Sequence, residues 1–180
     1  TLPYLELAKS LSPNDYDVYE TSAQIYEHFK MYDKAIANFK EAYHKGADSF
    51  DILFQMGLCY LNADDKAQAL KVFGKLSKIQ PKNEFVLDHM AMIVFDNEWY
   101  QKGVETYEVV IDLYPYSETA WHYYGNSLAG LGQFDKALWA QEMVIAINPN
   151  SFLGHFGIAS TFQEMEEYEQ GLEKYEEVLK

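Results

Sequence analysis

The sequence of residues 53–81 reads LFQMGLCYLNADDKAQALKVFGKLSKIQP. Its large apolar residues recur at helical spacing in two runs, which predicts two helices folded back on each other as a hairpin. Small residues stand where two such helices would cross, at Gly57 and Ala69. Pro81 follows the second run and is expected to end it, because proline cannot continue a helix. This stretch therefore predicts a helical hairpin with a close contact at Gly57.

The same pattern returns every 34 residues without insertion or deletion, which indicates a repeat protein. Copies begin at Tyr16, Phe50, Glu84, Glu118 and Phe152. The eighth position of each copy is small: Ala23, Gly57, Ala91, Gly125 and Ala159. The twentieth position is also small: Ala35, Ala69, Gly103, Ala137 and Gly171. Because both positions are small in every copy, we expect the two helices of a copy to touch there.

Large residues around these contacts form a predicted core stripe. The fourth, eleventh and twenty-fourth positions hold Tyr19, Leu53, Leu87, Trp121; Tyr26, Tyr60, Val94, Leu128, Phe162; and Phe39, Phe73, Tyr107, Tyr175. Three residues depart from the pattern: His155 at the fourth position, Gln141 at the twenty-fourth, and Lys66 where an aromatic residue otherwise stands. None of them is expected to abolish the fold.

Residues that start and stop helices repeat with the same period. The predicted stops are Pro13, Pro81, Pro115 and Pro149, and Gly46 takes this part beside Ala47. The predicted N-caps of the following helices are Asp15, Ser49, Asn83, Ser117 and Ser151.

The run Leu53, Met56, Gly57, Tyr60, Ala69, Phe73, Pro81 resembles the signature of the tetratricopeptide repeat (TPR) family. The resemblance covers residues 16–180 and implies an all-α α-solenoid, a right-handed superhelix of antiparallel helix pairs. It implies one continuous solenoid domain made of a preceding half repeat and five repeats, the last truncated: 1–15, 16–49, 50–83, 84–117, 118–151 and 152–180. Because both ends fall inside a repeat and no polar capping helix follows, we expect a segment of a longer array.

The charge of the chain bears on its partners. It contains 14 lysines, no arginine and 28 acidic residues, a net charge of −14. Such a chain repels nucleic acids and anionic membrane surfaces and attracts basic partners. No apolar run reaches the roughly 20 residues of a membrane span. The single Cys59 excludes an intrachain disulfide and is expected in the core. No cofactor is expected.

The lysines fall on the predicted second helices or their flanking turns, and the first helices carry none. In the TPR family the first helices line the concave surface. The resemblance therefore implies an acidic and aromatic groove, with these candidate peptide-binding residues: Glu20, Gln24, Phe54, Leu58, Leu61, Phe85, Asp88, His89, Met92, Phe95, His122, Tyr123, Asn126 and Phe156.

The extra apolar residues of this groove have two explanations. They could pack against neighbouring repeats, or they could anchor a peptide or helix that carries apolar and basic residues. The second explanation predicts a protein-interaction scaffold or adaptor. The alternative is a structural or self-associating segment, whose groove or uncapped ends are filled by its own longer chain or by a second copy.

Catalysis and metal binding are not expected. His89, His122 and His155 lie about one repeat apart, too far to share a metal ion, and the common catalytic motifs are absent. The groove also lacks the cationic clamp that binds chaperone tails in one TPR subclass, since Asn126 alone cannot replace it. A cytoplasmic location is favoured, and the periplasm or another compartment stays open because the N-terminus is expected to be truncated.

Overall fold

The computed structural model describes residues 2–47 and 49–166. Within these residues there are ten α-helices and no strand, which confirms the all-α prediction. Their bounds are α1 Leu2–Leu11, α2 Tyr16–His28, α3 Tyr32–His44, α4 Ser49–Asn62, α5 Lys66–Ile79, α6 Glu84–Asp96, α7 Tyr100–Leu113, α8 Glu118–Gly130, α9 Phe134–Ile147 and α10 Phe152–Glu164. The predicted second helix of the fifth repeat, with Gly171 and Tyr175, lies outside the described residues.

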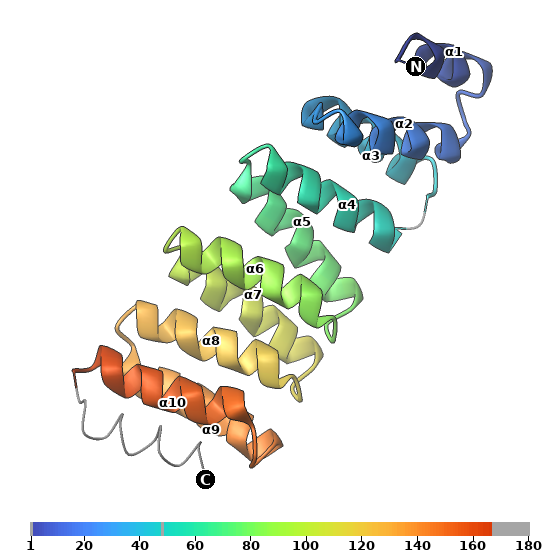
Figure 1. Ribbon diagram of the computed structural model, residues 1–180. Helices are drawn as coiled ribbons and strands as arrows, with labels where there is room; N and C mark the ends of the chain where they lie inside the picture. The colour runs from blue at the N-terminus through green and yellow to red at the C-terminus, as the bar shows by residue number, and fades with distance from the viewer. Residues whose placement is uncertain (1, 48, 167–180) are drawn as a thin grey trace. The chain divides into compact units, whose positions relative to one another are not determined.

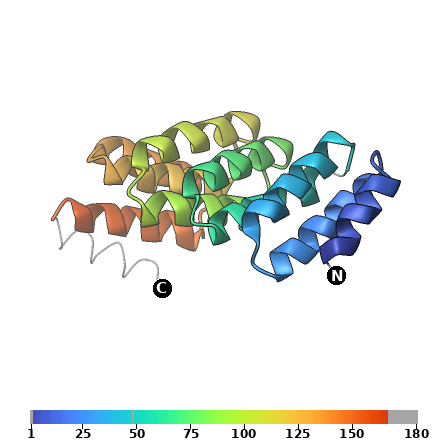
Figure 2. The ribbon, with the colours of Figure 1, turned by 90° about the horizontal axis from the view of Figure 1, so that it is seen from above.

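The chain divides into two compact units, residues 1–79 (unit 1) and 80–180 (unit 2). Unit 1 contains α1 to α5, and unit 2 contains α6 to α10. Within each unit, consecutive helices pack side by side as hairpins (Figures 1 and 2). In unit 2 the helix α8 also contacts both α6 and α10, so these three first helices form one layer (Figure 1).

The helix bounds follow the period of the sequence. The first helices α2, α6, α8 and α10 begin at the first position of a predicted repeat, and α4 begins one residue earlier. Each second helix that precedes a proline ends two residues before it: Leu11, Ile79, Leu113 and Ile147. The helix α3 ends two residues before Gly46, which has a φ of +97° and stands where the other copies have the residue before the proline. The division of the chain into repeat domains stays a prediction.

The small eighth positions leave room for the second helix of the same hairpin. A Cβ atom built on Gly57 would lie 2.8 Å from the ring of Phe73. A Cβ atom on Gly125 would lie 2.6 Å from the Gln141 amide nitrogen and 3.2 Å from the backbone oxygen of Ala137. The contacts below 3 Å are shorter than a Cβ atom tolerates, so a larger residue at Gly57 or Gly125 would require the facing side chain to shift.

The first and second helices of a repeat are joined by a turn with a recurring backbone conformation. The fifteenth position has a positive φ every time: Lys30 57°, Asp64 61°, Glu98 54°, Gly132 70° and Glu166 62°. Only Gly132 adopts this left-handed conformation without a steric cost. Next to it, in the first four copies, the amide of the sixteenth position donates to the carbonyl of the eleventh, as from Met31 to Tyr26 at 2.8 Å. This bond closes the C-terminus of the first helix.

Three of the predicted N-caps make the expected side-chain bond. Asp15, Asn83 and Ser117 accept hydrogen bonds from backbone amides in the first turns of α2, α6 and α8, at 3.1 to 3.3 Å. Ser151 occupies the N-cap position of α10, as predicted, but its side chain makes no capping bond. Its backbone carbonyl alone accepts, from the His155 amide at 3.3 Å. Ser49 is the first residue of α4 rather than the residue before it.

His155 fills the fourth position in the same way as the aromatic residues there. The Tyr19 hydroxyl donates to the carbonyl of Pro13 at 3.1 Å, and the Trp121 indole nitrogen donates to that of Pro115 at 2.9 Å. His155 Nε2 lies 3.1 Å from the carbonyl of Pro149, again six residues earlier. An imidazole with its proton on Nε2 can donate this bond. His155 therefore keeps a contact of the repeat that its polarity alone does not suggest.

Candidate functional site

The fourteen candidate peptide-binding residues divide between the two units. Five lie on α2 and α4 of unit 1: Glu20, Gln24, Phe54, Leu58 and Leu61. Nine lie on α6, α8 and α10 of unit 2: Phe85, Asp88, His89, Met92, Phe95, His122, Tyr123, Asn126 and Phe156. Each group is a possible site within its own unit.

The unit 1 group offers little exposed apolar surface. Phe54 is half-buried, and its ring lies edge-on to that of Phe73 with centroids 5.8 Å apart. Leu58 and Leu61 are also half-buried. Gln24 donates to the Glu20 carboxylate at 3.3 Å, one turn away on α2. The apolar residues of this group thus serve, at least in part, the packing of unit 1.

The exposed side of α6 in unit 2 is different. Phe85 is 74% exposed and Met92 is 47% exposed, and two helical turns separate them on the same side of the helix. Asp88, between them, is exposed. His89 Nδ1 lies 2.6 Å from the carbonyl of Phe85, so its ring is held by the helix's own backbone. We call Phe85, Asp88, His89 and Met92 the α6 face.

Tyr123 on α8 connects this face to the neighbouring helix. Its hydroxyl donates a hydrogen bond to Asp88 Oδ1 at 2.8 Å. Burial, followed by this bond to Asp88, raises the pKa of Tyr123 well above its usual range. The half-buried Phe95 packs between two rings, with centroids 6.1 Å from Tyr123 and 6.2 Å from Tyr100. The Asp88 carboxylate is therefore held in place, and Phe95 forms a wall rather than a projecting anchor.

His122 and Asn126 belong to a hydrogen-bonded cluster around Gln141 of α9. His122 is only 5% exposed, with Nδ1 3.2 Å from Gln141 Oε1 and Nε2 3.0 Å from Asn126 Nδ2. Gln141 Nε2 donates to Asn126 Oδ1 at 2.9 Å and to the His122 carbonyl at 3.1 Å. Because an amide nitrogen only donates and an amide oxygen only accepts, this pattern requires a neutral His122 with its proton on Nδ1.

The environment of His122 agrees with a neutral ring. Burial lowers the pKa of His122, and hydrogen bonds to Gln141 and to the Leu153 backbone oppose that shift. Sequence reasoning placed His122 as groove lining and missed the cluster. The available signal was Gln141 itself, because a buried amide at a core position needs polar partners.

Phe156 lies on α10, in the same layer of unit 2 as the α6 face. It is 38% exposed, and its ring stacks on that of Phe152 with centroids 5.5 Å apart. Phe152 is itself exposed. The first-helix layer of unit 2 therefore shows aromatic surface on α10 as well as on α6.

Other reactive groups in the described part of the chain do not form a site. Cys59 is buried, and burial raises the pKa of its thiol to about 12. No group of three or more histidine, cysteine or acidic side chains is placed to hold a metal ion, among residues 2–47 and 49–166. None of the helices described is both long and apolar enough to cross a membrane.

Comparison with known proteins places the fold. A family model described as tetratricopeptide repeat matches residues 28–91. Anaphase-promoting complex subunit 3 of Schizosaccharomyces pombe is 26% identical over 149 residues, which cover 82% of this chain and 22% of that protein. The chain thus spans about a fifth of the length of this relative.

Solved structures share the arrangement of helices. A crystal structure of MamA has a TM-score of 0.63 at 16% sequence identity, and the match covers 91% of this chain and 90% of the MamA chain. MamA from Desulfovibrio magneticus RS-1 has a TM-score of 0.63 at 21% identity, with 91% and 93% covered. YrrB has a TM-score of 0.63 at 17% identity, with 97% and 90% covered. These likenesses show the α-solenoid fold of paired helices.

Within the chain itself, the 34-residue period, the small residues at the helix crossings and the repeated turn at the fifteenth position agree with these matches. Together these observations and matches support a tetratricopeptide repeat protein.

Proposed function

We propose that this protein is a protein-interaction scaffold or adaptor whose α6 face binds a peptide or amphipathic helix carrying apolar and basic residues. The observation that carries the proposal is the exposure of Phe85 and Met92 on one side of α6. A large exposed aromatic ring beside a flexible thioether is typical of surfaces that bind partners. The known proteins of this fold provide the general role, since TPR proteins bind other proteins.

The apolar anchors would supply most of the affinity. Burying a Phe or Met side chain that is otherwise exposed contributes about 1.5 to 3 kcal/mol. Ion pairs at the rim of an interface contribute only about 0.2 to 1 kcal/mol each. We therefore expect Phe85 and Met92 to dominate, with Phe156 extending the apolar surface on α10.

The charges of unit 2 favour a basic partner. Residues 80–180 contain five lysines and seventeen acidic residues. The described lysines of this unit, Lys82, Lys102 and Lys136, lie on second helices or in turns. Asp88 adds a carboxylate between the two anchors, and Tyr123 holds it in place at 2.8 Å. A preorganised carboxylate loses less entropy when it meets a lysine or arginine of the partner.

Two of the similar proteins support a binding role. YrrB is described as a TPR protein with an unusual peptide-binding site. The relative from Schizosaccharomyces pombe is a subunit of the anaphase-promoting complex. We propose no catalytic role and no cofactor for this chain, in keeping with a family that is generally non-enzymatic.

The experiment uses a fluorescein-labelled helical probe of about 18 residues, with leucine at helical spacing and lysine elsewhere. Its partner probe replaces every lysine by glutamate. We expect the lysine probe to bind the full chain in an anisotropy titration, and the glutamate probe to bind at least tenfold more weakly. Phe85→Ala and Met92→Ala should each weaken binding of the lysine probe about fivefold or more, and the melting temperature should hardly change.

Phe29→Ala is the matched control, because it removes another exposed phenylalanine, 54% exposed, from unit 1. It should leave probe binding unchanged. Equal losses in all three variants would reject the α6 face as the binding site. A chain that dimerises in a light-scattering concentration series and becomes monomeric on Phe85→Ala would show that a second copy fills the face instead.

A further inference from the structure

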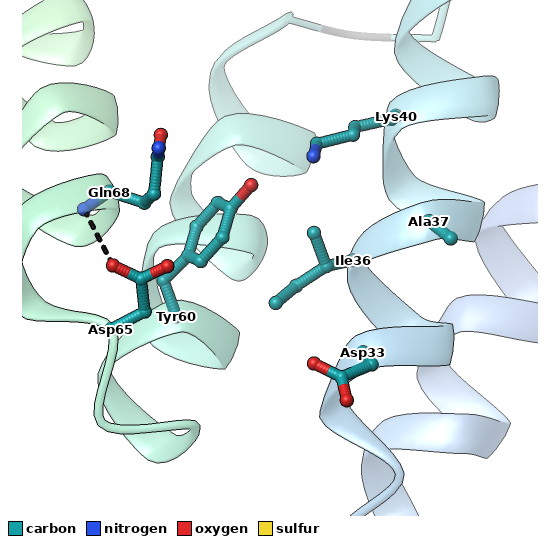
Figure 3. Close-up of a pocket in the computed structure, with 7 residues that line it drawn as sticks. All are labelled: Asp33, Ile36, Ala37, Lys40, Tyr60, Asp65 and Gln68. Atoms are coloured by element: carbon teal, nitrogen blue, oxygen red, sulfur yellow. Dashed lines mark hydrogen bonds between the residues drawn. The ribbon is translucent and has the colours of Figure 1, made fainter.

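A cavity of about 420 Å³ opens on unit 1 between the second helices α3 and α5 (Figure 3). Its lining residues come from three helices and one turn: Asp33, Ile36, Ala37 and Lys40 from α3, Tyr60 from α4, Asp65 from the turn before α5, and Gln68 from α5. None of them is among the candidate groove residues. The cavity therefore needs its own explanation.

Two buried side chains, Ile36 and Tyr60, form the floor of the cavity. Ile36 and Tyr60 are buried residues of the unit 1 core, at 6% and 8% exposure, and each presents an edge to the opening. The ammonium of Lys40 lies 5.6 Å from the centroid of the Tyr60 ring. A cation thus already lies over this ring, and the alkyl stem of a second long side chain could lie along the same floor.

The charged groups around the opening are divided by sign. Asp33 on α3 and Asp65 at the start of α5 stand on opposite walls, on the side of the cavity away from the Lys40 ammonium (Figure 3). Asp65 Oδ1 accepts a hydrogen bond from the backbone amide of Gln68 at 3.1 Å. Among the described residues, neither carboxylate and no atom of Lys40 forms an ion pair.

The same cavity position in unit 2 has another chemistry. Two repeats further along, residues 101 and 133 are glutamines where unit 1 has Asp33 and Asp65. Lys40 corresponds to Glu108, and Tyr60 corresponds to Leu128. The helix α9 forms without a side-chain cap at Gln133, so the repeat does not require an acid there. Tyr60 is a core residue and Asp65 caps α5, but the repeat does not require the combination of two carboxylates and an ammonium around an aromatic ring that unit 1 has here.

We propose that this cavity is a second peptide-binding site, which takes an arginine or lysine side chain between Asp33 and Asp65 and a neighbouring carboxylate of the same peptide beside Lys40. The separation of signs matches a short segment with a basic and an acidic residue close together. The stem of the basic side chain covers Tyr60 and Ile36, and its charged end meets the two carboxylates. A volume of about 420 Å³ accommodates one long side chain with part of its neighbour.

The open cavity and its exposed charges imply weak binding. Pairs of exposed charges contribute little each, so a short peptide should bind with a Kd of about 1 to 10 mM. Affinity in this range is measured by nuclear magnetic resonance. It would become useful when the same partner also contacts another surface of the protein, since linked sites raise the effective concentration.

The test titrates the full 180-residue chain, labelled with ¹⁵N, with acetyl-Arg-Ala-Glu-amide. We expect progressive shifts of the Ala37 amide and of the Gln68 side-chain amide, and no shift of the Gln101 side-chain amide at the corresponding place in unit 2. Acetyl-Ala-Ala-Ala-amide should cause no shift at any of the three. Shifts that are absent at Ala37 and Gln68, or equally large at Gln101, overturn the proposal.

Three variants sharpen the result. Asp33→Asn combined with Asp65→Asn should weaken binding at least fivefold, and the asparagine at residue 65 can still cap α5. Lys40→Gln should remove the preference for acetyl-Arg-Ala-Glu-amide over acetyl-Arg-Ala-Gln-amide. Asp64→Asn is the matched control, because its exposed carboxylate pairs with Lys66 and does not line the cavity. If Asp64→Asn weakens binding as much as the double variant, general attraction to an acidic chain explains the data and the proposal fails.

The outcome is independent of the proposed function of the α6 face. That face lies in unit 2, and its test depends on Phe85 and Met92. The cavity can fail while the helical probe still binds, and the reverse is equally possible.

Discussion

The hairpin α4–α5 of unit 1 and the hairpin α8–α9 of unit 2 fill the equivalent space between their two helices with side chains of different polarity. In both, a glycine at the eighth position faces the side chain at the twenty-fourth. Gly57 faces the ring of Phe73, and Gly125 faces the amide of Gln141. The repeat thus prescribes how much room lies between its helices, and leaves open whether an apolar or a hydrogen-bonded group fills it.

The apolar side chain and the polar side chain at this position need different neighbours. Phe73 is fully buried and needs only neighbours of the right shape. Gln141 is equally buried, but each of its polar atoms must find a partner, which His122 and Asn126 provide. Gly157 of α10 also approaches Gln141 closely. Gln141 of α9 is therefore hydrogen-bonded to α8, the other helix of its hairpin, and also packs closely against α10.

The largest effect is expected from emptying the apolar hairpin. Phe73→Ala should lower the free energy of unfolding by about 3 to 5 kcal/mol, because the lost ring leaves a cavity beside Gly57. Urea unfolding followed by circular dichroism measures this change. Phe29→Ala, which removes an exposed ring, is the comparison. A similar cost for both variants would contradict the place of Phe73 in the core.

Overfilling the polar hairpin comes next. Gly125→Leu should cost about 1 to 3 kcal/mol or more, since even its Cβ would lie 3.2 Å from the backbone oxygen of Ala137. Because each repeat touches only its neighbours, we also expect the unfolding transition to broaden. Gly132→Leu is not a suitable control, because its φ of +70° adds backbone strain of its own. Unchanged thermal stability of Gly125→Leu would contradict the close crossing of α8 and α9.

Replacing the polar side chain between α8 and α9 by an apolar one should also lower the free energy of unfolding. Gln141→Leu keeps the approximate volume but removes the hydrogen-bond partner of His122 Nδ1 and of Asn126 Oδ1, while the bond between His122 Nε2 and Asn126 Nδ2 remains. Each buried polar group left unpaired costs about 1 to 3 kcal/mol. The triple variant Gln141→Leu, His122→Leu, Asn126→Leu should recover part of this loss. A double-mutant cycle measures the recovery from urea unfolding, with Gln141→Leu as one change and the pair His122→Leu, Asn126→Leu as the other. No recovery would show that volume, and not pairing, determines stability at this place.

The smallest effect is a dependence on pH that only the polar hairpin should show. The pKa of His122 is lower in the folded chain than its ordinary value of about 6.5, so the unfolded chain binds more protons. Stability is then complete above about pH 6.5 and falls as the pH drops below it. Glu6, whose pKa Lys9 lowers, titrates at lower pH.

The measurement compares urea unfolding at several values between about pH 7.5 and 5.5. His122→Gln should reduce the slope of the free energy of unfolding against pH over this interval. The control is His155→Gln, because His155 is half-buried and hydrogen-bonded to the carbonyl of Pro149. An unchanged slope in His122→Gln would mean that His122 is as easily protonated in the folded chain as in the unfolded one.

Much of the fold could be predicted because it depends on period. The spacing of residues such as Gly57 and Pro81 determines where helices begin, end and cross, and the helix bounds agree with it to within one residue at each first helix. Contacts between repeats depend on pairs of side chains far apart in the sequence. The sequence alone therefore could not show that His122 meets Gln141 or that Tyr123 holds Asp88.

The same limit applies to the surfaces. Phe85 and Phe54 belong to the same pattern of apolar residues, yet one is exposed and the other packs on Phe73. The cavity of unit 1 is formed by side chains of α3, α4, α5 and the turn before α5, which no single motif links. The bond from His155 to Pro149 was hidden for another reason, because an imidazole with its proton on Nε2 imitates the indole of Trp121.

The repeated turn at the fifteenth position has a consequence for how the protein opens. At residues 31, 65, 99 and 133 the amide that follows the turn is bonded to a carbonyl at the eleventh position, over 2.8 to 2.9 Å. The eleventh position is in the core, so this bond breaks only when the end of the first helix leaves its packing. Deuterium exchange at these four amides should therefore be as slow as in the adjoining helices. The turns within the hairpins then resist local unfolding. A protease should therefore cut the segments between hairpins before it cuts these turns.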